Sequence, residues 1–324
     1  MGTCGKQTCV AGGGRSMTHD GEFSSCRNLD FLLDRCRDGK RMRIAAVCAQ
    51  DEDVLVALNE ARRQGIVEGV LVGDRAKIER VAETVGVDAG AFEIVHEPGE
   101  ADAAERAVRM VAEGRADTLM KGMVKTATLL KAVLNKEWGL RSGALLSHLF
   151  LFYIPKMGRF YGLTDGGINT YPDLQAKVGI LENAVNCYHA LGCVCPRVAA
   201  LSAVEVVNPD MPCTLDAAAL TQMQRRGQIK GCLVDGPLAL DNAVSEEAAR
   251  HKGIDSDVAG KADILLVPDI EAGNLLGKTM LYLTGGEGAG VILGAKVPVV
   301  LTSRIDSART KLLSIALGAV LSRK

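Results

Sequence analysis

The feature that most restricts the fold is an alternation of residue patterns that begins at Arg43. Continuous apolar runs at 43–49, 67–73, 92–97 and 116–122 are separated by segments with helical amphipathic spacing. Apolar runs without polar alternation are typical of strands buried on both faces, and helix-length segments between them indicate βαβ units. Right-handed crossovers then place helices on both faces of a largely parallel sheet. The sequence therefore predicts an α/β fold.

The alternation changes once, at 146–163, where two strand-like runs flank the turn at 155–158. A helix capped by Asp173 follows, and the alternation then resumes until an amphipathic helix at 307–322. The 324 residues exceed the ~250–300 at which a single core usually stops growing. We predict a flexible N-terminal extension at 1–26, a first α/β domain at 27–150 with 300–324, and a second at 151–299.

Composition argues against several classes of protein. The net charge is -1 and only 4% of residues are aromatic, so neither a basic surface nor a stacking platform for nucleic acid is expected. No apolar run reaches the ~20 residues of a membrane helix, and the N-terminus lacks the apolar region of a signal peptide. The ten cysteines are scattered and match no zinc spacing. We predict a cytoplasmic protein with reduced thiols, no metal and no tightly bound cofactor.

Polar residues collect just after the predicted strands, where open α/β sheets bind their ligands. Lys121 and Lys125 surround a predicted helix start, and Gly122 allows close approach of the backbone. The free N–H groups of that helix, Thr126 and the two ammonium groups suit an anion such as phosphate. The alternative is a surface helix with solvated lysines.

Further candidates lie in the glycine-rich loops. Arg141 beside Ser142 has the chemistry to grip a phosphate, although an ordinary loop arginine fits the pattern equally well. His148, between apolar residues, is interpreted as a core histidine. Asn242 is interpreted as a helix cap. The remaining candidates for orienting a ligand are Thr164, Asp165, Asn169, Asp235, Asn274 and Lys278.

Ser303 and Arg304 form the sharpest candidate pair, because they follow the predicted strand at 297–303 directly. A hydroxyl there can bond a thiol or a carbonyl, and a guanidinium can stabilise charge that develops on an oxygen. Asp306 can accept a proton if its pKa is raised, or it can simply cap the next helix.

Six segments together resemble the phosphate acetyl/butyryltransferase family. They are LMKGMVKT, VLNKEWGLRSGALLSH, LTDGGINTYPDLQAKVGILENAV, DGPLALDNAVS, ADILLVPDIEAGNLLGKT and GAKVPVVLTSRIDS, and they occur in this order between about Arg43 and Ser322. NKEWGLR and DGPLALDNA resemble the butyryl branch more than the acetyl branch.

The resemblance implies reversible transfer of an acyl group between coenzyme A and inorganic phosphate, with acyl-CoA, phosphate and acyl phosphate as the partners. It also implies a two-domain fold similar to isocitrate and isopropylmalate dehydrogenases, an interdomain active-site cleft, and a homodimer or higher homo-oligomer. Ser303 would bond the CoA sulfur and Arg304 would stabilise the transition state. The acetyl branch uses an aspartate base where this sequence has Thr310, which leaves Asp306 as the carboxylate of the segment.

Three other functions are alternatives to this interpretation. An acetyl-specific transferase would carry the same motifs and differ in the walls of its acyl pocket. A decarboxylating dehydrogenase of the same fold would need a cluster of metal-binding aspartates and a nicotinamide site, and neither pattern is present. A non-catalytic regulatory module would be expected to lack the intact pair Ser303 and Arg304.

Overall fold

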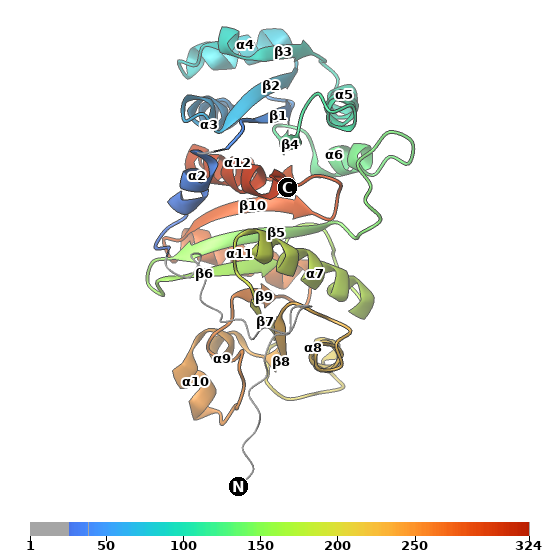
Figure 1. The fold of residues 1–324 in the computed structure, drawn as a ribbon, viewed down its shortest axis with the longest axis vertical. Coiled ribbons are helices and arrows are strands. Elements are labelled where there is room, and N and C mark those ends of the chain that lie inside the picture. The colour runs from blue at the N-terminus through green and yellow to red at the C-terminus, as the bar shows by residue number, and fades with distance from the viewer. Residues whose placement is uncertain (1–25, 38, 324) are drawn as a thin grey trace. The chain divides into compact units, whose positions relative to one another are not determined.

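A computed structural model describes residues 26–37 and 39–323 (Figure 1). The chain divides into two compact units: unit 1 contains residues 147–286, and unit 2 contains residues 28–146 and 287–324. Each unit combines strands with helices, which confirms the predicted α/β class. The sequence-based boundaries differ from this division at two places. They group residues 147–150 with the first domain and residues 287–299 with the second. The extension predicted at 1–26 lies outside the described residues, apart from Cys26.

Unit 2 contains a sheet that is parallel except at one edge. Its strands follow the order β3 (Glu93–His96), β2 (Val67–Gly73), β1 (Met42–Val47), β4 (Thr118–Lys121), β11 (Val299–Val300) and β10 (Glu287–Leu293). Only β10 runs antiparallel to its neighbour β11. Strand β11 contains only Val299 and Val300, so the strand predicted at 297–303 is much too long. Pro298 has no N–H to donate to a ladder, so regular pairing begins only after it.

The helices of unit 2 form two groups beside these strands (Figure 1). They are α2 (Asp30–Arg37), α3 (Glu52–Arg63), α4 (Arg75–Thr84), η1 (Ala89–Ala91), α5 (Glu100–Ala112), α6 (Thr126–Val133) and α12 (Ala308–Ser322). Helix α12 packs against β10, α3 and α2, and α5 packs against α6. The amphipathic pattern predicted for α12 is wrong, because every residue from Thr310 to Ala319 is buried between these neighbours.

Helix α2 precedes Arg43, in a part of the chain for which the sequence pattern predicted no element. Its apolar side chains are buried, and Asp30 pairs with Arg309 of α12. At its other end the Arg323 guanidinium donates to the carbonyl oxygens of Arg35 and Cys36, each at 2.8 Å. An eight-residue helix is too short to show a clear period, and it is held by the last helix of the chain.

Unit 1 has a mixed sheet with the strand order β5 (Ser147–Ile154), β6 (Arg159–Thr164), β9 (Ile264–Leu266), β7 (Arg197–Leu201) and β8 (Leu233–Leu238). Strands β5 and β6 form the predicted antiparallel pair, and the other neighbours are parallel. The helices are α7 (Leu174–Ala190), α8 (Pro212–Arg225), α9 (Leu240–Val244), α10 (Glu246–His251) and α11 (Ile270–Tyr282). Asp173 caps α7 as predicted, since its carboxylate accepts the Ala176 N–H at 2.8 Å.

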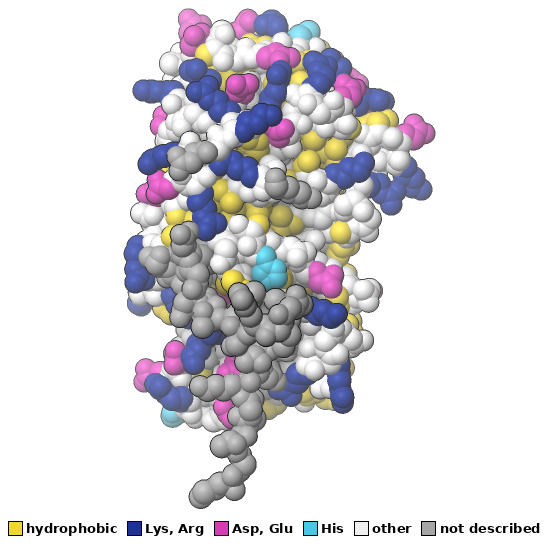
Figure 2. All heavy atoms as spheres, in the orientation of Figure 1, with side chains coloured by type: hydrophobic (Ala, Val, Ile, Leu, Met, Phe, Trp, Pro, Cys, Tyr) yellow, Lys and Arg dark blue, Asp and Glu magenta, His cyan; other side chains and the backbone are white. Residues whose placement is uncertain are grey.

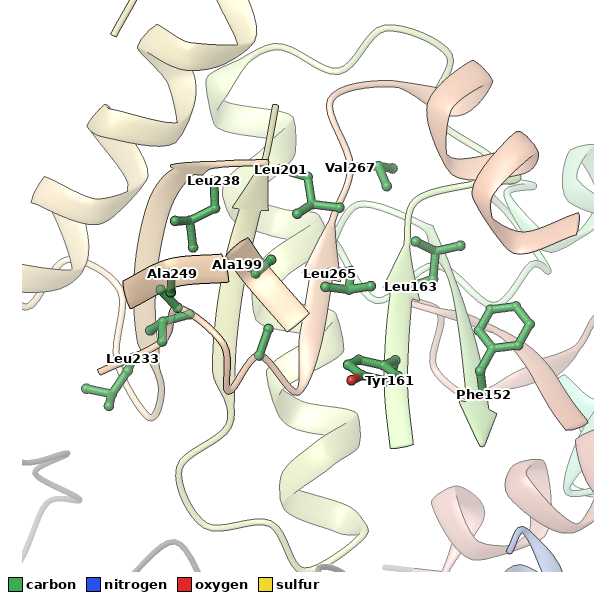
Figure 3. Close-up of a cluster of buried hydrophobic side chains, with 14 of the residues drawn as sticks. Phe152, Tyr161, Leu163, Ala199, Leu201, Leu233, Leu238, Ala249, Leu265 and Val267 are labelled. Atoms are coloured by element: carbon green, nitrogen blue, oxygen red, sulfur yellow. The ribbon is translucent and has the colours of Figure 1, made fainter. Parts of the chain in front are cut away.

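The core of unit 1 collects side chains from neighbouring strands. Figure 3 shows Phe152 of β5, Leu163 of β6, Leu265 of β9 and Leu201 of β7 in one buried cluster. Because successive strands contribute to the same layer, the carboxyl ends of β6, β9 and β7 are held at one edge. The loops that follow them start from a rigid base.

The described part of the face in Figure 2 carries charges of both signs, with basic and acidic side chains interspersed. Within the described residues, no helix is both long and apolar enough to cross a bilayer. The same part of the chain holds no cluster of His, Cys, Asp and Glu suited to a metal ion.

Candidate active site

The carboxyl edge of the unit 2 sheet brings together segments that are far apart in the sequence. Val47 at the end of β1 lies in register with Lys121 at the end of β4, and Met120 of β4 lies in register with Val300 of β11. Parallel strands in register end at the same edge, so the loops after all three strands meet there. This places Lys121 in the electrostatic neighbourhood of Arg304, as the sequence predicted, and also of Asp51.

Gly122 lets two of these loops touch. Its N–H donates to the Val47 carbonyl at 2.9 Å, and the Met123 N–H donates to the Cys48 carbonyl at 2.9 Å. A Cβ atom at position 122 would lie 2.4 Å from the Cys48 carbonyl oxygen, so only glycine fits. Gly122 therefore allows close approach of the chain's own backbone, whereas the approach to an anion predicted from the sequence stays a prediction.

Lys121 is a buried cation at this edge. Its side chain is 7% exposed, and its Nζ donates to the Gly122 carbonyl at 3.2 Å. Burial is the main cause that lowers its pKa below the usual value, and the positive charge of Arg304 lowers it further. A nearby anion would favour the charged form of Lys121 against both effects, so the electrostatics of this edge suit negative charge.

The segment from Ser303 to Asp306 forms a tight loop between β11 and α12. The Asp306 carboxylate is buried and accepts the Ser303 N–H at 2.7 Å, while the Asp306 N–H donates to the Ser303 carbonyl at 3.2 Å. Ser307, not Asp306, caps α12 by accepting the Thr310 N–H at 3.2 Å. The loop thus fixes the backbone of Ser303 and leaves the Arg304 side chain exposed.

The helix start at Lys125 and Thr126 differs from the expectation of free N–H groups. Glu100, the first residue of α5, accepts the Lys125 N–H at 3.1 Å and the Thr128 hydroxyl at 2.7 Å. These hydrogen bonds, with Thr128 first, lower the Glu100 pKa. A carboxylate of the chain therefore already occupies one of the donors that the sequence assigned to an external anion.

Arg141 and Ser142 have local roles in the structure. The Ser142 hydroxyl donates to the Gly294 carbonyl at 2.5 Å and accepts the Ala144 N–H at 3.0 Å. Arg141 pairs through its backbone with Ala295 and has an exposed side chain. Both residues thus hold the loop to the turn after β10, and the guanidinium remains accessible.

In unit 1 the loop after β6 is organised by one carboxylate. Asp165 is 2% exposed and accepts the N–H groups of Gly167, Ile168 and Asn169, as well as the Asn169 side-chain amide at 2.7 Å. Thr164 is fully buried, and its hydroxyl donates to the His148 carbonyl at 2.8 Å. The structure therefore gives Thr164 and Asp165 a clear role in building the loop.

Helix α11 reaches the same loop. The Asn274 amide approaches the Gly166 carbonyl at 3.5 Å, and a Cβ atom at Gly273 would lie 2.7 Å from the Gly166 Cα atom. Farther along the helix, the Lys278 ammonium lies 5.7 Å from the centre of the Tyr282 ring. Asn274 thus joins the group formed by Asp165 and Asn169, and the nearest aromatic partner of Lys278 lies one turn away.

Three further positions were interpreted from sequence. His148 is buried in β5, edge-on to Phe150, as expected of a core histidine. Asp235 accepts the N–H of the neighbouring Gly236 at 2.9 Å. The cap assigned to Asn242 is wrong, because Asn242 is fully buried inside α9 and Ser245 caps α10 instead. The helix predicted from 242 is split in two by this serine.

Three site residues were not predicted from the sequence: Asp51, Glu100 and Lys311. Each lies at or near a helix start, and only the tertiary structure places it beside Lys121 or the Ser303–Asp306 loop. Cys48 is also close, but burial raises the pKa of its thiol to about 11. A thiol with that pKa stays protonated at neutral pH, so Cys48 is a poor nucleophile.

Comparison with known proteins gives the family. The family model described as phosphate acetyl/butaryl transferase matches residues 92–319. This chain belongs to that family. A phosphate butyryltransferase from Clostridium acetobutylicum is 50% identical over 296 residues, which cover 91% of this chain and 98% of the relative. A phosphate acetyltransferase from Thermotoga maritima is 46% identical over 292 residues, covering 90% and 99%.

A solved structure of the family agrees with the fold. The crystal structure of a branched-chain phosphotransacylase from Enterococcus faecalis matches with a TM-score of 0.77 and 33% identity, over 87% of this chain and 99% of the other. The family match includes Lys121, Glu100, Ser303 and Arg304, whereas Asp51 lies before it. The resemblance drawn from the six segments is therefore confirmed.

The buried charge of Lys121 is expected to lower the stability of the fold. Lys121→Met should raise the free energy of unfolding at pH 7 by about 1 kcal/mol, because it removes a desolvated cation whose charge is also opposed by that of Arg304. The folded-state pKa is lowered, so the destabilisation is complete below it and fades as pH rises toward the unfolded value near 10.5. Urea unfolding at pH 7 and pH 9.5 measures the difference, which should shrink at the higher pH. The exposed neighbour variant Lys125→Met is the control and should change little; equal effects of the two variants would contradict the assignment.

Proposed function

We propose that this protein catalyses reversible transfer of a short acyl group, butyryl or similar, between coenzyme A and inorganic phosphate. The observation that carries the proposal is the grouping of two cations at one sheet edge: the buried Lys121 ends β4, and the exposed Arg304 lies on the loop after β11. On that loop, Asp306 accepts the Ser303 N–H. Two cations at one sheet edge suit a reaction in which both reactants are anions. The family relatives named for butyryl and acetyl transfer support the same chemistry.

Residues of this chain can carry out the acyl transfer between acyl phosphate and CoA. In one direction the CoA thiolate attacks the acyl carbon of an acyl phosphate, the new C–S bond forms, and the C–O bond to phosphate breaks. Arg304 donates a hydrogen bond to the oxyanion of the tetrahedral intermediate, and the Ser303 hydroxyl donates a hydrogen bond to the CoA sulfur. Lys121 balances the charge of the phosphate as it leaves. Holding both substrates in one orientation supplies the rest of the rate enhancement, and no covalent enzyme intermediate is needed.

The CoA thiol must lose a proton before it attacks. Asp306 is the carboxylate of the segment, but it is buried and accepts the Ser303 N–H. Thr310, at the position where the acetyl branch has its aspartate, has no acid–base function at neutral pH. We propose that Asp306 acts as a positioning residue by holding Ser303. The catalytic role as a base that the sequence predicted for Asp306 stays a prediction.

The other candidate residues are proposed as contacts for phosphate or for coenzyme A. They are Lys125, Thr126, Arg141, Ser142, Thr164, Asp165, Asn169, Asp235, Asn274 and Lys278. The accessible members, such as Arg141 and Asn274, fit direct contact, whereas the buried Thr164 and Asp165 fit a supporting role. An architecture like that of isocitrate dehydrogenase with an interdomain cleft, a homo-oligomer and a cytoplasmic location also stay predictions.

A thiol-release assay tests the function. Purified protein is mixed with acyl-CoA and phosphate, and free CoA is followed with acetyl, butyryl and branched-chain substrates. We expect release that depends on phosphate, with butyryl-CoA or a branched chain giving a higher kcat/KM than acetyl-CoA. Each methylene is worth only ~1–3 kcal/mol in an apolar pocket, so activity on several chains is expected.

Phosphate acetyltransferase is the second candidate, supported by the 46% identity to the relative of that name. The same assay separates the two, because an acetyl-specific enzyme would prefer acetyl-CoA. Absence of phosphate-dependent release with every acyl-CoA would reject both candidates.

A further inference from the structure

Lys311 is a buried lysine that the mechanism above does not use. Lys311 lies in the first turns of α12 and is only 1% exposed. Lysines are almost never fully buried unless they are paired, so this position calls for partners that hold the ammonium.

The partners of Lys311 are the backbone of the Ser303–Asp306 loop and two carboxylates of another segment. The Lys311 ammonium donates to the Asp306 carbonyl at 2.5 Å and to the Arg304 carbonyl at 3.4 Å. It lies 3.9 Å from an Asp51 oxygen and 3.7 Å from an Asp53 oxygen. One cation therefore bridges the loop after β11 and the start of α3.

The charges explain why an ammonium is stable here. Lys121 is close enough for its pKa to be lowered by Lys311 and by Arg304, so repulsion among cations opposes the arrangement. The carboxylates of Asp51 and Asp53 offset this repulsion, since both face the Lys311 ammonium. The two carbonyl oxygens satisfy further donors, as a buried charge requires.

We propose that Lys311 is a positioning residue for acyl transfer, which holds the Ser303–Asp306 loop in its working conformation by clamping two of its carbonyl groups. The inference rests on the function proposed above. Lys311 is too deeply buried to contact a substrate, so it acts through Ser303 and Arg304. Its bridge to Asp51 also ties the loop to the strand end beside Lys121.

The first test compares Lys311→Met with Lys311→Gln. Met removes charge and donors, whereas Gln keeps N–H donors for the carbonyl groups. We expect kcat to fall about 10²-fold in Lys311→Met, because a loop misplaced by ~1 Å loses that much rate, and less in Lys311→Gln. The KM for acyl-CoA should stay within about twofold, since no substrate contact is removed. The matched control is Lys177→Met, which removes a buried lysine paired with Asp216 at 2.6 Å in unit 1 and should not reproduce this pattern.

Hydrogen exchange measured by mass spectrometry tests loop positioning without reference to activity. The Ser303 amide is bonded to Asp306, so exchange in the peptide containing 302–306 should become about tenfold faster in Lys311→Met and change less in Lys311→Gln. Wild-type exchange in this peptide would overturn the proposal. Equal loss of kcat in Lys177→Met would also overturn it, by showing a general effect on folding.

The two readouts keep this proposal separate from the function itself. If the wild-type protein releases no CoA but Lys311→Met still speeds exchange at 302–306, the proposed function is wrong and the positioning role of Lys311 in the loop is supported. If Lys311→Met does not fold, the comparison of wild type with Lys311→Gln decides by the same exchange measurement.

Discussion

Replacing Arg304 with Ala should lower kcat for acyl transfer about 10²–10³-fold, the loss typical of removing one oxyanion donor. The guanidinium is exposed and the loop is held by Asp306 and by backbone groups, so the fold should not depend on this side chain. The thermal midpoint should therefore stay within about 2 °C of wild type. Steady-state CoA release together with a melting curve measures both quantities.

Two variants sharpen the Arg304 experiment. Arg304→Lys keeps the charge but loses the planar fork of donors, so its kcat should lie between those of wild type and Arg304→Ala. Arg80→Ala removes an equally exposed arginine from α4 and should retain wild-type kcat. A near-native rate in Arg304→Ala would remove this residue from the catalytic group.

Asp165→Ala should cause the largest loss of stability. The buried carboxylate accepts three backbone N–H groups and one side-chain amide, and all four lose their partner together. Breaking a buried charged network of this kind costs about 3–5 kcal/mol. Urea unfolding followed by circular dichroism measures the free energy of unfolding, which should fall by this amount.

The control for Asp165 is another aspartate with a simpler task. Asp173 is exposed and caps α7 through one N–H, so Asp173→Ala should cost only about 1 kcal/mol. Asp165→Asn keeps an acceptor oxygen without the charge and should fall between the two. If Asp165→Ala costs no more than Asp173→Ala, the loop after β6 is held by other contacts.

The sequence was most informative about residues whose place in the fold depends on the strand next to them in the chain. Lys121 ends β4, and Ser303 and Arg304 lie just beyond the end of β11. Parallel pairing in register brings the ends of such strands to one edge. That rule predicts the grouping of Lys121 with Arg304 without knowledge of the strand order. The α/β class follows from the same alternation of patterns.

The sequence was least informative where one contact depends on several segments. Nothing in the pattern of α12 distinguishes Lys311 from a solvated lysine, because its burial comes from β10, α2 and α3 packing around the helix. Glu100 resembles an ordinary acidic residue at a helix start, and only the fold places α6 against it. Asn242 followed the preference of its residue type for caps, whereas burial within α9 decided its place.

Unit 2 is formed from two separate stretches of the chain, and this affects the order in which the two units can fold during translation. Strand β11 lies between β4 and β10, so this sheet pairs β4, which precedes unit 1 in the chain, with a strand that follows it. Unit 1 is continuous over 147–286 and can fold while the rest is still being translated. Arg304 and Lys311 are translated after it, so a nascent chain cannot form the loop of its own proposed active site before residues 147–286 have been synthesised.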